Sequence, residues 1–196
     1  MKHGQQLPLE RCPHCNVAKP SINQKIPPIL TGDHAGANTR AWAIYVCATC
    51  GGAVLACSPL NANSQISHLW PAPAEVAETV PTRAREFLTQ AISSLSAPAG
   101  AERLSASAVD AMLKDKGYKE GSLNSRIDSA SKDHLITAEM AAWAHEIRLE
   151  ANDQRHADES AALPDATDAQ KVIEFATALA QLLYVLPARV ERGRKS

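Results

Sequence analysis

Two C-x-x-C pairs constrain the fold of this chain more than any other feature of its sequence. The first pair is Cys12 and Cys15, the second is Cys47 and Cys50, and 31 residues lie between them. A pair at this spacing can bind one metal ion from a tight turn, and two such turns supply the four thiolates that a tetrahedral Zn2+ prefers. We therefore predict that these four cysteines are the ligands of one zinc ion.

A redox-active C-x-x-C pair and adventitious cysteines are the alternative interpretations. A redox pair is expected beside a strand-helix-strand unit, and the sequence around the two pairs has no such pattern. Coordination by four thiolates leaves no open position for water at the metal. The predicted Zn2+ is therefore structural, so it should stabilise the fold of its segment and take no part in catalysis.

The residues around the two pairs favour the same interpretation. Asn16 and Gly51 follow the pairs directly, and both residue types tolerate the positive φ that lets a turn curl around a metal. Cys57 is the fifth cysteine, and we expect it to be a small buried residue at the end of a strand. His14 lies inside the first pair, and we expect it to be exposed rather than a ligand.

The composition changes near residue 60, which indicates two domains. All five cysteines precede this point, whereas apolar residues after about residue 80 recur every three or four positions, as they do in helices. We predict a zinc ribbon over 1–60, a Pro-rich linker over 61–80 and a helical bundle over 81–196. The predicted fold class is therefore mainly α, a helical bundle with a small N-terminal β zinc ribbon.

The ribbon is expected to contain one small hairpin. Residues 42–46 alternate as in a half-buried strand, and Gly51 and Gly52 precede a second short apolar run. Pro59, just before the linker, and Pro71 and Pro73 within it disfavour regular structure. We expect Trp70 to anchor this linker to a surface.

Apolar periodicity predicts five helices in the second domain. The first carries an apolar stripe around Leu88, the second covers 98–117, and a short third covers 123–130. Gly117 is expected to end the second helix, because glycine readily adopts the left-handed conformation of a helix end.

The last two helices have recognisable end residues. Thr137 is expected to cap the fourth helix, whose apolar stripe extends to Ala151. Thr167 and Gln170 are expected to form a capping box for the fifth helix, which should end at Pro187.

Charge and hydropathy weigh against two broad classes of protein, although the charge permits a local basic patch. The 196 residues include 20 basic and 21 acidic side chains with a pI near 6.6, so the chain lacks the bulk positive charge of many nucleic-acid-binding proteins. Residues 1–60 have a formal charge of +3, which falls to +1 when four thiolates and one Zn2+ are added. The chain has no apolar stretch of signal-peptide length at its start, and its most apolar run is too short to span a bilayer. We expect a soluble, cytoplasmic protein that does not bind a membrane.

The densest polar cluster lies in residues 143–156. If that helix persists, Arg148, Asn152 and His156 are spaced four residues apart on one side, with Arg155 beside them. An arginine can bind a phosphate and a histidine can move a proton, which suffices for metal-free phosphodiester cleavage. The alternative is structural, with the same side chains in local ion pairs, caps and helix-end contacts.

Several motifs together resemble a known family. CPHCN, CATCGG, the Pro-rich joint, MLKDKGY, WAHEIRLEAND and YVLPARV are similar to proteins that carry domain of unknown function 4145 behind a zinc ribbon, and the resemblance covers almost the whole chain. That family is similar to the HEPN superfamily, whose all-helical domains often dimerise. The superfamily includes ribonucleases with an Arg roughly four to six residues before a His. The resemblance also implies a setting near restriction and phage-defence proteins.

This chain departs from the ribonuclease pattern. Position 151 is Ala, and Arg148 has seven residues between it and His156. We therefore expect a non-catalytic or weakly catalytic adaptor, homodimeric, that binds nucleic acid or a protein partner through Arg148, Asn152, Arg155 and His156. The alternative is a metal-independent ribonuclease in which His156 is the general base and Arg148 or Arg155 stabilises the phosphorane at a dimer interface.

Overall fold

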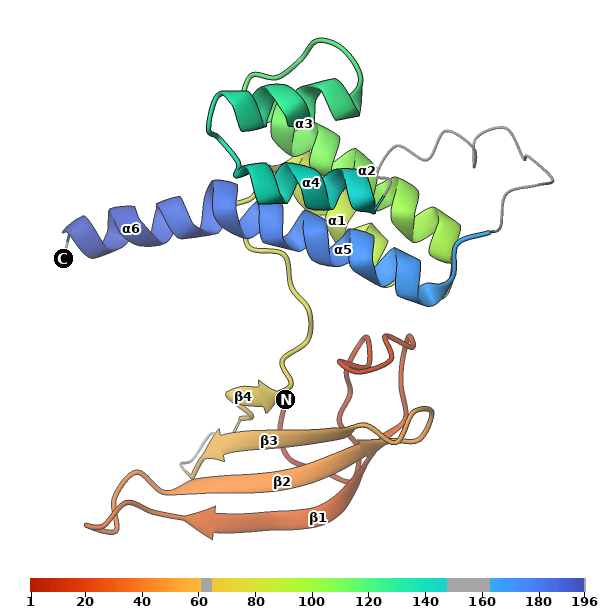
Figure 1. Ribbon diagram of the computed structural model, residues 1–196. Coiled ribbons are helices and arrows are strands. Elements are labelled where there is room, and N and C mark those ends of the chain that lie inside the picture. The colour runs from red at the N-terminus through yellow and green to blue at the C-terminus, as the bar shows by residue number, and fades with distance from the viewer. Residues whose placement is uncertain (61–64, 148–162, 196) are drawn as a thin grey trace. The chain divides into compact units, whose positions relative to one another are not determined.

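A computed structural model describes residues 1–60, 65–147 and 163–195 (Figure 1). The chain divides into two units, Met1–Ala74 and Glu75–Ser196. Helices make up 45% of the residues that the structure describes, and β structure, mostly a four-stranded antiparallel sheet, makes up 19%, so the fold is mixed α/β. The predicted mainly α class is wrong, because the N-terminal unit holds a larger sheet than the hairpin that residues 42–46 indicated.

The sheet has the strand order β1-β2-β3-β4, and each strand runs antiparallel to the next (Figure 1). Its strands are β1 (Ile22–Thr31), β2 (Arg40–Cys47), β3 (Ala53–Pro59) and β4 (His68–Trp70). β4 lies inside the segment that the sequence assigned to the linker. The predicted hairpin corresponds to β2 and β3.

The two faces of the sheet differ in burial because side chains alternate along each strand. In β2, Ala41, Ala43, Tyr45 and Cys47 are buried and the residues between them are only half-buried. The buried side, here called the inner face, packs against the N-terminal segment that includes Leu7. The other side, here called the outer face, has no such cover among the residues that the structure describes.

β1 is an edge strand that the apolar pattern did not reveal. It contains Pro27 and Pro28, and its register with β2 shifts between Ile26 and Ile29. Proline has no N–H to donate to a sheet, so it is tolerated where one side of the strand is unpaired. The proline pair breaks the period-two pattern, which is why this strand was not predicted.

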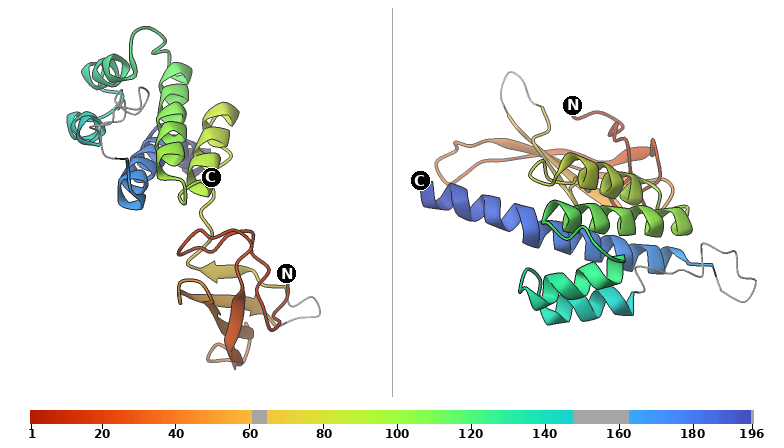
Figure 2. Two further views of the ribbon diagram at one scale, coloured as in Figure 1. Left: turned by 90° about the vertical axis from the view of Figure 1, so that its right-hand side faces the viewer. Right: turned by 90° about the horizontal axis from the view of Figure 1, so that it is seen from above.

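The helical unit contains the predicted helices, with some changed ends. The helices are α1 (Thr82–Ser93), α2 (Pro98–Asp115), α3 (Leu123–Lys132), α4 (Ala138–Glu146) and α5 (Ala166–Ala180). α2 contacts both α1 and α5, and α3 pairs with α4 (Figure 2). Gly117 follows α2 with φ of 103°, as predicted for the residue after a helix end.

The caps of the last two helices give a mixed result. Thr137 caps α4 as predicted, because its side chain accepts a hydrogen bond from the N–H of Met140. The capping box of α5 uses Asp165 and Asp168, so the predicted box of Thr167 and Gln170 is wrong. The helix thus begins two residues earlier than predicted, and the carboxylate of Asp165 accepts hydrogen bonds from the free N–H groups of Thr167 and Asp168 in its first turn.

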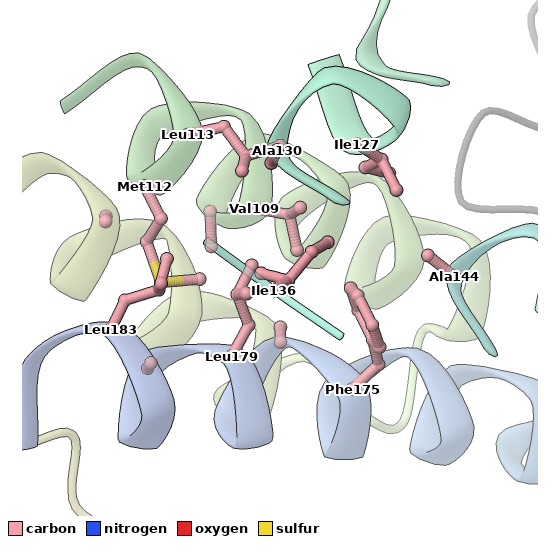
Figure 3. Close-up of a cluster of buried hydrophobic side chains, with 14 of the residues drawn as sticks. Val109, Met112, Leu113, Ile127, Ala130, Ile136, Ala144, Phe175, Leu179 and Leu183 are labelled. Carbon is pink, nitrogen blue, oxygen red and sulfur yellow. The ribbon is translucent and has the colours of Figure 1, made fainter. Parts of the chain in front are cut away.

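The core of the helical unit is built mainly from α2 and α5. Phe175, Leu179 and Leu183 project from the α5 side towards Val109 and Met112 of α2 (Figure 3). All five are buried. The ring of Phe175 also meets Trp143 of α4 edge-on, with 5.3 Å between ring centroids. The apolar stripe predicted for the last helix is therefore the core-facing side of α5.

The last helix does not end at Pro187, contrary to the prediction. α5 continues through a π-helical turn, η2 (Gln181–Val185), into α6 (Leu186–Lys195). A proline removes one helical hydrogen bond and crowds the carbonyl four residues earlier, and a π turn just before it accommodates this change. α6 has no buried residues.

The continuous helical segment Ala166–Lys195 is 30 residues long, and by length and composition alone it could cross a membrane. Its most apolar window has a mean hydropathy of 1.3, and 44% of that window is buried. The buried side of this segment is the face of α5 and η2 that packs in the helical core. A core helix of this kind meets the same length and composition criterion.

Candidate metal centre

The cysteines of the two C-x-x-C pairs come together at one end of the sheet unit. Cys47 ends β2 and Cys50 lies in the turn before β3, whereas Cys12 and Cys15 lie in the segment that precedes β1. The four Sγ atoms all lie within 4.8 Å of one another, and those of Cys12 and Cys50 are 3.9 Å apart. These four residues can therefore hold a metal ion, as the spacing predicted.

Each pair lies on the same kind of turn. The N–H of Asn16 donates to the carbonyl of Cys12, and the N–H of Gly51 donates to the carbonyl of Cys47, both at 2.9 Å. Asn16 has φ of 58° and Gly51 has φ of 73°. The predicted positive φ after each pair is confirmed, and it lets each turn curl so that both of its sulfurs face the same point.

Backbone N–H groups point at the sulfurs of both turns. The N–H of His14 donates to Sγ of Cys12, and the N–H of Gly52 donates to Sγ of Cys50, both at 3.4 Å. Such donors stabilise the negative charge of a thiolate. The two turns thus contribute partial positive charge to the centre as well as ligands.

His14 joins the two turns, a role that its sequence position did not reveal. Its side chain is exposed, as predicted, and its Nε2 forms a 2.8 Å hydrogen bond with the carbonyl of Ala53. The imidazole lies directly over Gly52, where an added Cβ would be only 2.5 Å from Cγ and Cδ2 of His14. A glycine is therefore needed at position 52 for the ring to bridge the turns.

The thiols share protons unequally when no metal is bound. Burial, together with hydrogen bonds to the thiols of Cys50 and Cys12, raises the pKa of Cys15 to about 12. Burial also opposes ionisation of Cys47, but donation by the N–H groups of Cys50 and Thr49 outweighs it and lowers the pKa of Cys47 to about 6. Metal binding must therefore displace protons from this cluster.

The remaining cysteine stands apart from the cluster. Cys57 is 3% exposed, which confirms the expected burial, and it lies in β3. All five cysteines are free thiols.

The polar cluster predicted as a binding or catalytic site lies outside the described residues. Arg148, Asn152, Arg155 and His156 all fall in the segment 148–162. α4, the helix expected to carry them, ends at Glu146 with Ile147 as its C-cap. Their suggested roles stay predictions.

An aromatic cluster on the outer face was not predicted as a site. Trp42 of β2 stacks on Trp70 of β4, with 5.7 Å between ring centroids, and His68 stacks on Trp70 at 5.5 Å. Trp70 was expected to anchor a linker, and it does pack on a surface, that of the sheet. Trp42 is 26 residues or more from the other two rings in the sequence, so their contact can be foreseen only when β4 is recognised as a strand. With three residues, β4 was too short to be predicted.

Comparison with known proteins identifies the family of the helical part. Residues 89–196, more than half of the chain, match the family model described as Domain of unknown function (DUF4145), and the chain therefore belongs to this family. No curated protein and no solved structure matched the chain.

Proposed function

We propose that this member of the DUF4145 family is a non-catalytic or weakly catalytic adaptor whose N-terminal sheet unit is a zinc ribbon held together by a structural Zn2+. The observation that carries the proposal is the cluster of four Sγ atoms within 4.8 Å of one another. A tetrahedral Zn2+ with Zn–S distances of ~2.3 Å places its sulfurs ~3.8 Å apart. The 3.9 Å between Sγ of Cys12 and Sγ of Cys50 matches that spacing.

A closed sulfur site supports a binding role rather than a metal-catalysed reaction. When four thiolates occupy a tetrahedral Zn2+, neither water nor substrate has a coordination position. In that case the metal only stabilises the sheet, and any function of the unit depends on the surface that the sheet presents. We therefore propose binding of nucleic acid or a protein partner as the activity.

The helical unit extends the proposal. We propose that it is HEPN-like and that the protein forms a homodimer in the cytoplasm, in a phage-defence setting, as its sequence motifs suggested. Support comes from the family of residues 89–196 and from an apolar core that α2 and α5 share. The ribonuclease alternative, with His156 and Arg148 or Arg155, stays a prediction.

Metal removal tests the structural role. The full chain is treated with a zinc chelator while tryptophan fluorescence and far-UV circular dichroism are recorded. We expect the emission of Trp42 and Trp70 in the sheet unit to shift towards that of exposed tryptophan, with helical ellipticity largely kept, because the apolar core of the helical unit contains no cysteine. Unchanged fluorescence after verified loss of zinc would contradict the proposal.

Two cysteine variants make this test specific. Cys50→Ser removes a proposed ligand, and Cys57→Ser removes a buried cysteine outside the cluster. We expect only Cys50→Ser to lose zinc. Mixed RNAs in metal-free buffer separate the adaptor from the enzyme: cleavage that disappears in His156→Ala would favour the ribonuclease, and intact RNA would favour the adaptor.

A further inference from the structure

The outer face of the sheet carries a column of three aromatic rings. Trp42, Trp70 and His68 stack in that order, with angles of 25° and 13° between successive ring planes. The register explains how the rings meet, because Trp42 pairs with Cys57 and Cys57 pairs with His68. The rings thus stand on both sides of β3, and Cys57 lies beneath them, where it is buried on an otherwise half-exposed face.

Hydrogen bonds fix the two ends of this column. Nε1 of Trp42 donates to Oγ1 of Thr31 at 2.8 Å. Nδ1 of His68 forms a 2.9 Å hydrogen bond with Oγ of Ser67, which in turn donates to the carbonyl of Cys57. Each ring therefore has a preferred orientation before any partner binds, which lowers the entropy lost on binding.

The column is exposed to solvent. Trp70 is 45% exposed, and Ile26 and Ile29 of β1 extend the apolar surface at 46% and 58%. Isolated apolar side chains are common on surfaces, but a continuous aromatic and aliphatic patch on an ordered sheet is typical of an interaction site.

The edges of the same sheet are poorly suited to bind a peptide as an added strand. On one edge, β1 contains Pro27 and Pro28, and on the other, β4 has only three residues. Strand addition needs a row of free backbone N–H and C=O groups. The sheet therefore offers a face rather than an edge for recognition.

Charge favours an anionic partner. The segment 1–74 contains five Lys or Arg residues and only two carboxylates. One of these, Asp33, accepts hydrogen bonds from Ala35, Ala37 and Asn38 within its own loop. With four thiolates and a Zn2+ the unit keeps a formal charge of +1, whereas the whole chain counted in the same way has −3.

Arg40 is well placed to use this charge. It lies two residues before Trp42 on β2, so its side chain is on the outer face as well. Among the residues that the structure describes, no carboxylate forms an ion pair with Arg40. A guanidinium beside stacked rings is the combination that binds phosphate and base together.

We propose that the outer face of the sheet binds single-stranded nucleic acid, whose bases stack on the outward sides of Trp42 and His68 at the two ends of the ring column and contact the exposed part of Trp70 between them, while Arg40 contacts a phosphate. This inference rests on the proposed adaptor function and names its ligand and its binding surface. Stacking accepts any base, so recognition by this face has little sequence preference. The residues of this surface differ from Arg148, Asn152, Arg155 and His156, the residues that the sequence suggested.

Fluorescence anisotropy with labelled oligonucleotides tests the proposal. The zinc-loaded full chain is titrated into single-stranded oligo-dT and oligo-rU of about 12 nucleotides, with a duplex of the same length as comparison. We expect both single strands to bind more tightly than the duplex and to quench tryptophan emission. The absence of binding at low salt by zinc-loaded protein overturns the proposal.

Three variants locate the binding surface. We expect Trp70→Leu to weaken binding about 10-fold or more, and Trp70→Phe, which keeps a ring, to weaken it less. Arg40→Gln should lower the affinity. It should also reduce the slope of log affinity against log salt concentration by about one, as expected when one phosphate contact is lost. Leu163→Ala, which removes a side chain 84% exposed in the other unit, should change nothing. Equal affinity of Trp70→Leu and wild type contradicts the proposal.

These measurements distinguish failure of the nucleic-acid inference from failure of the proposed adaptor function. If chelation leaves the tryptophan emission of the sheet unit unchanged, the metal-held fold itself is wrong. If chelation unfolds the sheet unit, and the zinc-loaded protein still binds no oligonucleotide, only the nucleic-acid inference fails. If light scattering instead finds a dimer that Trp70→Leu dissociates, the face binds a second copy of the chain, which also overturns the inference.

Discussion

Replacement of Gly52 by alanine is predicted to weaken the metal centre without touching a ligand. The new Cβ would lie 2.5 Å from Cγ and Cδ2 of His14 and 2.9 Å from its Cβ, closer than such atoms approach in proteins. The imidazole must then move, and its 2.8 Å hydrogen bond with the carbonyl of Ala53 is lost or stretched. Position 52 does not have the positive φ seen at Gly51, so the backbone itself accepts alanine.

The size of the effect follows from this overlap. Overpacking of this kind costs about 1–3 kcal/mol, and the lost hydrogen bond falls within the same range. Because zinc binding and folding of the sheet unit are coupled, we expect zinc affinity to fall by about 5-fold to 150-fold. Competition with a chromophoric chelator at fixed pH measures this change directly.

A double-mutant cycle separates the overlap from other causes. His14→Gly removes every atom that the new Cβ would meet, so Gly52→Ala should cost much less in that background. Gly100→Ala in α2 is the matched control, since nothing lies within 4 Å of its added Cβ, and helix propensity predicts neutral or increased stability. An equal cost of Gly52→Ala with and without the His14 ring would refute this reasoning.

Three further predictions concern both units. Phe175→Ala should lower the free energy of unfolding of the helical unit by about 3–5 kcal/mol in urea titrations followed by circular dichroism, because the ring is fully buried and meets Trp143 edge-on; a loss below ~1 kcal/mol would contradict that packing. Tyr184→Phe should cost about 1–2 kcal/mol in the same titration, because the single O–H of Tyr184 lies within hydrogen-bond distance of two acceptors, Oδ2 of Asp115 at 2.8 Å and the carbonyl of Met112 at 3.1 Å, and no loss would show that these groups find other partners. Zinc affinity should rise with pH above neutrality, because Cys15, with its pKa raised to about 12, must release a proton on binding. The affinity should fall more steeply below about pH 6, where Cys47 also gains a proton. Calorimetry in buffers of different ionisation enthalpy should detect the released protons, and a pH-independent affinity would be inconsistent with this set of ligands.

The metal centre could be predicted from sequence because its determinants are local. Each C-x-x-C pair and the residue after it specify one turn, and Asn16 and Gly51 are residue types that tolerate the positive φ found there. The bridge from His14 to Ala53 could not be predicted, since it joins residues 39 positions apart whose contact depends on how the two turns face each other. The hint in the sequence was Gly52: the positive φ of the turn explains Gly51, and a second glycine beside it suggested that another group approaches the backbone closely.

The sheet was predicted only in part because its edge strands lack a regular pattern. Pro27 and Pro28 interrupt β1, and three residues are too few for β4 to show alternation. Both strands are identified by their pairing with β2 and β3, which is a tertiary property. For the same reason the stacking of Trp42 on Trp70 was not predicted, and with it the outer face as a binding surface.

In the helical unit, apolar periodicity predicted the core better than the helix ends. The stripe that includes Phe175 and Leu179 is buried as expected. The ends depended on which of several acceptable caps the chain uses, and Asp165 is an alternative to Thr167 of a residue type that is preferred over Thr at the N-cap. Pro187 was expected to end the helix, but a π turn before it lets the helix continue.

X-ray absorption spectroscopy at the zinc edge shows whether four thiolates coordinate a zinc ion in this protein. Protein purified without added metal should contain one zinc per chain, with a first shell of four sulfur atoms at ~2.3 Å and no nitrogen or oxygen ligand. Cys57→Ser should give the same spectrum as wild type, because Cys57 lies outside the cluster of ligands. A shell that contains nitrogen or oxygen, or protein that folds without any metal, would contradict the account of a sheet held by four thiolates.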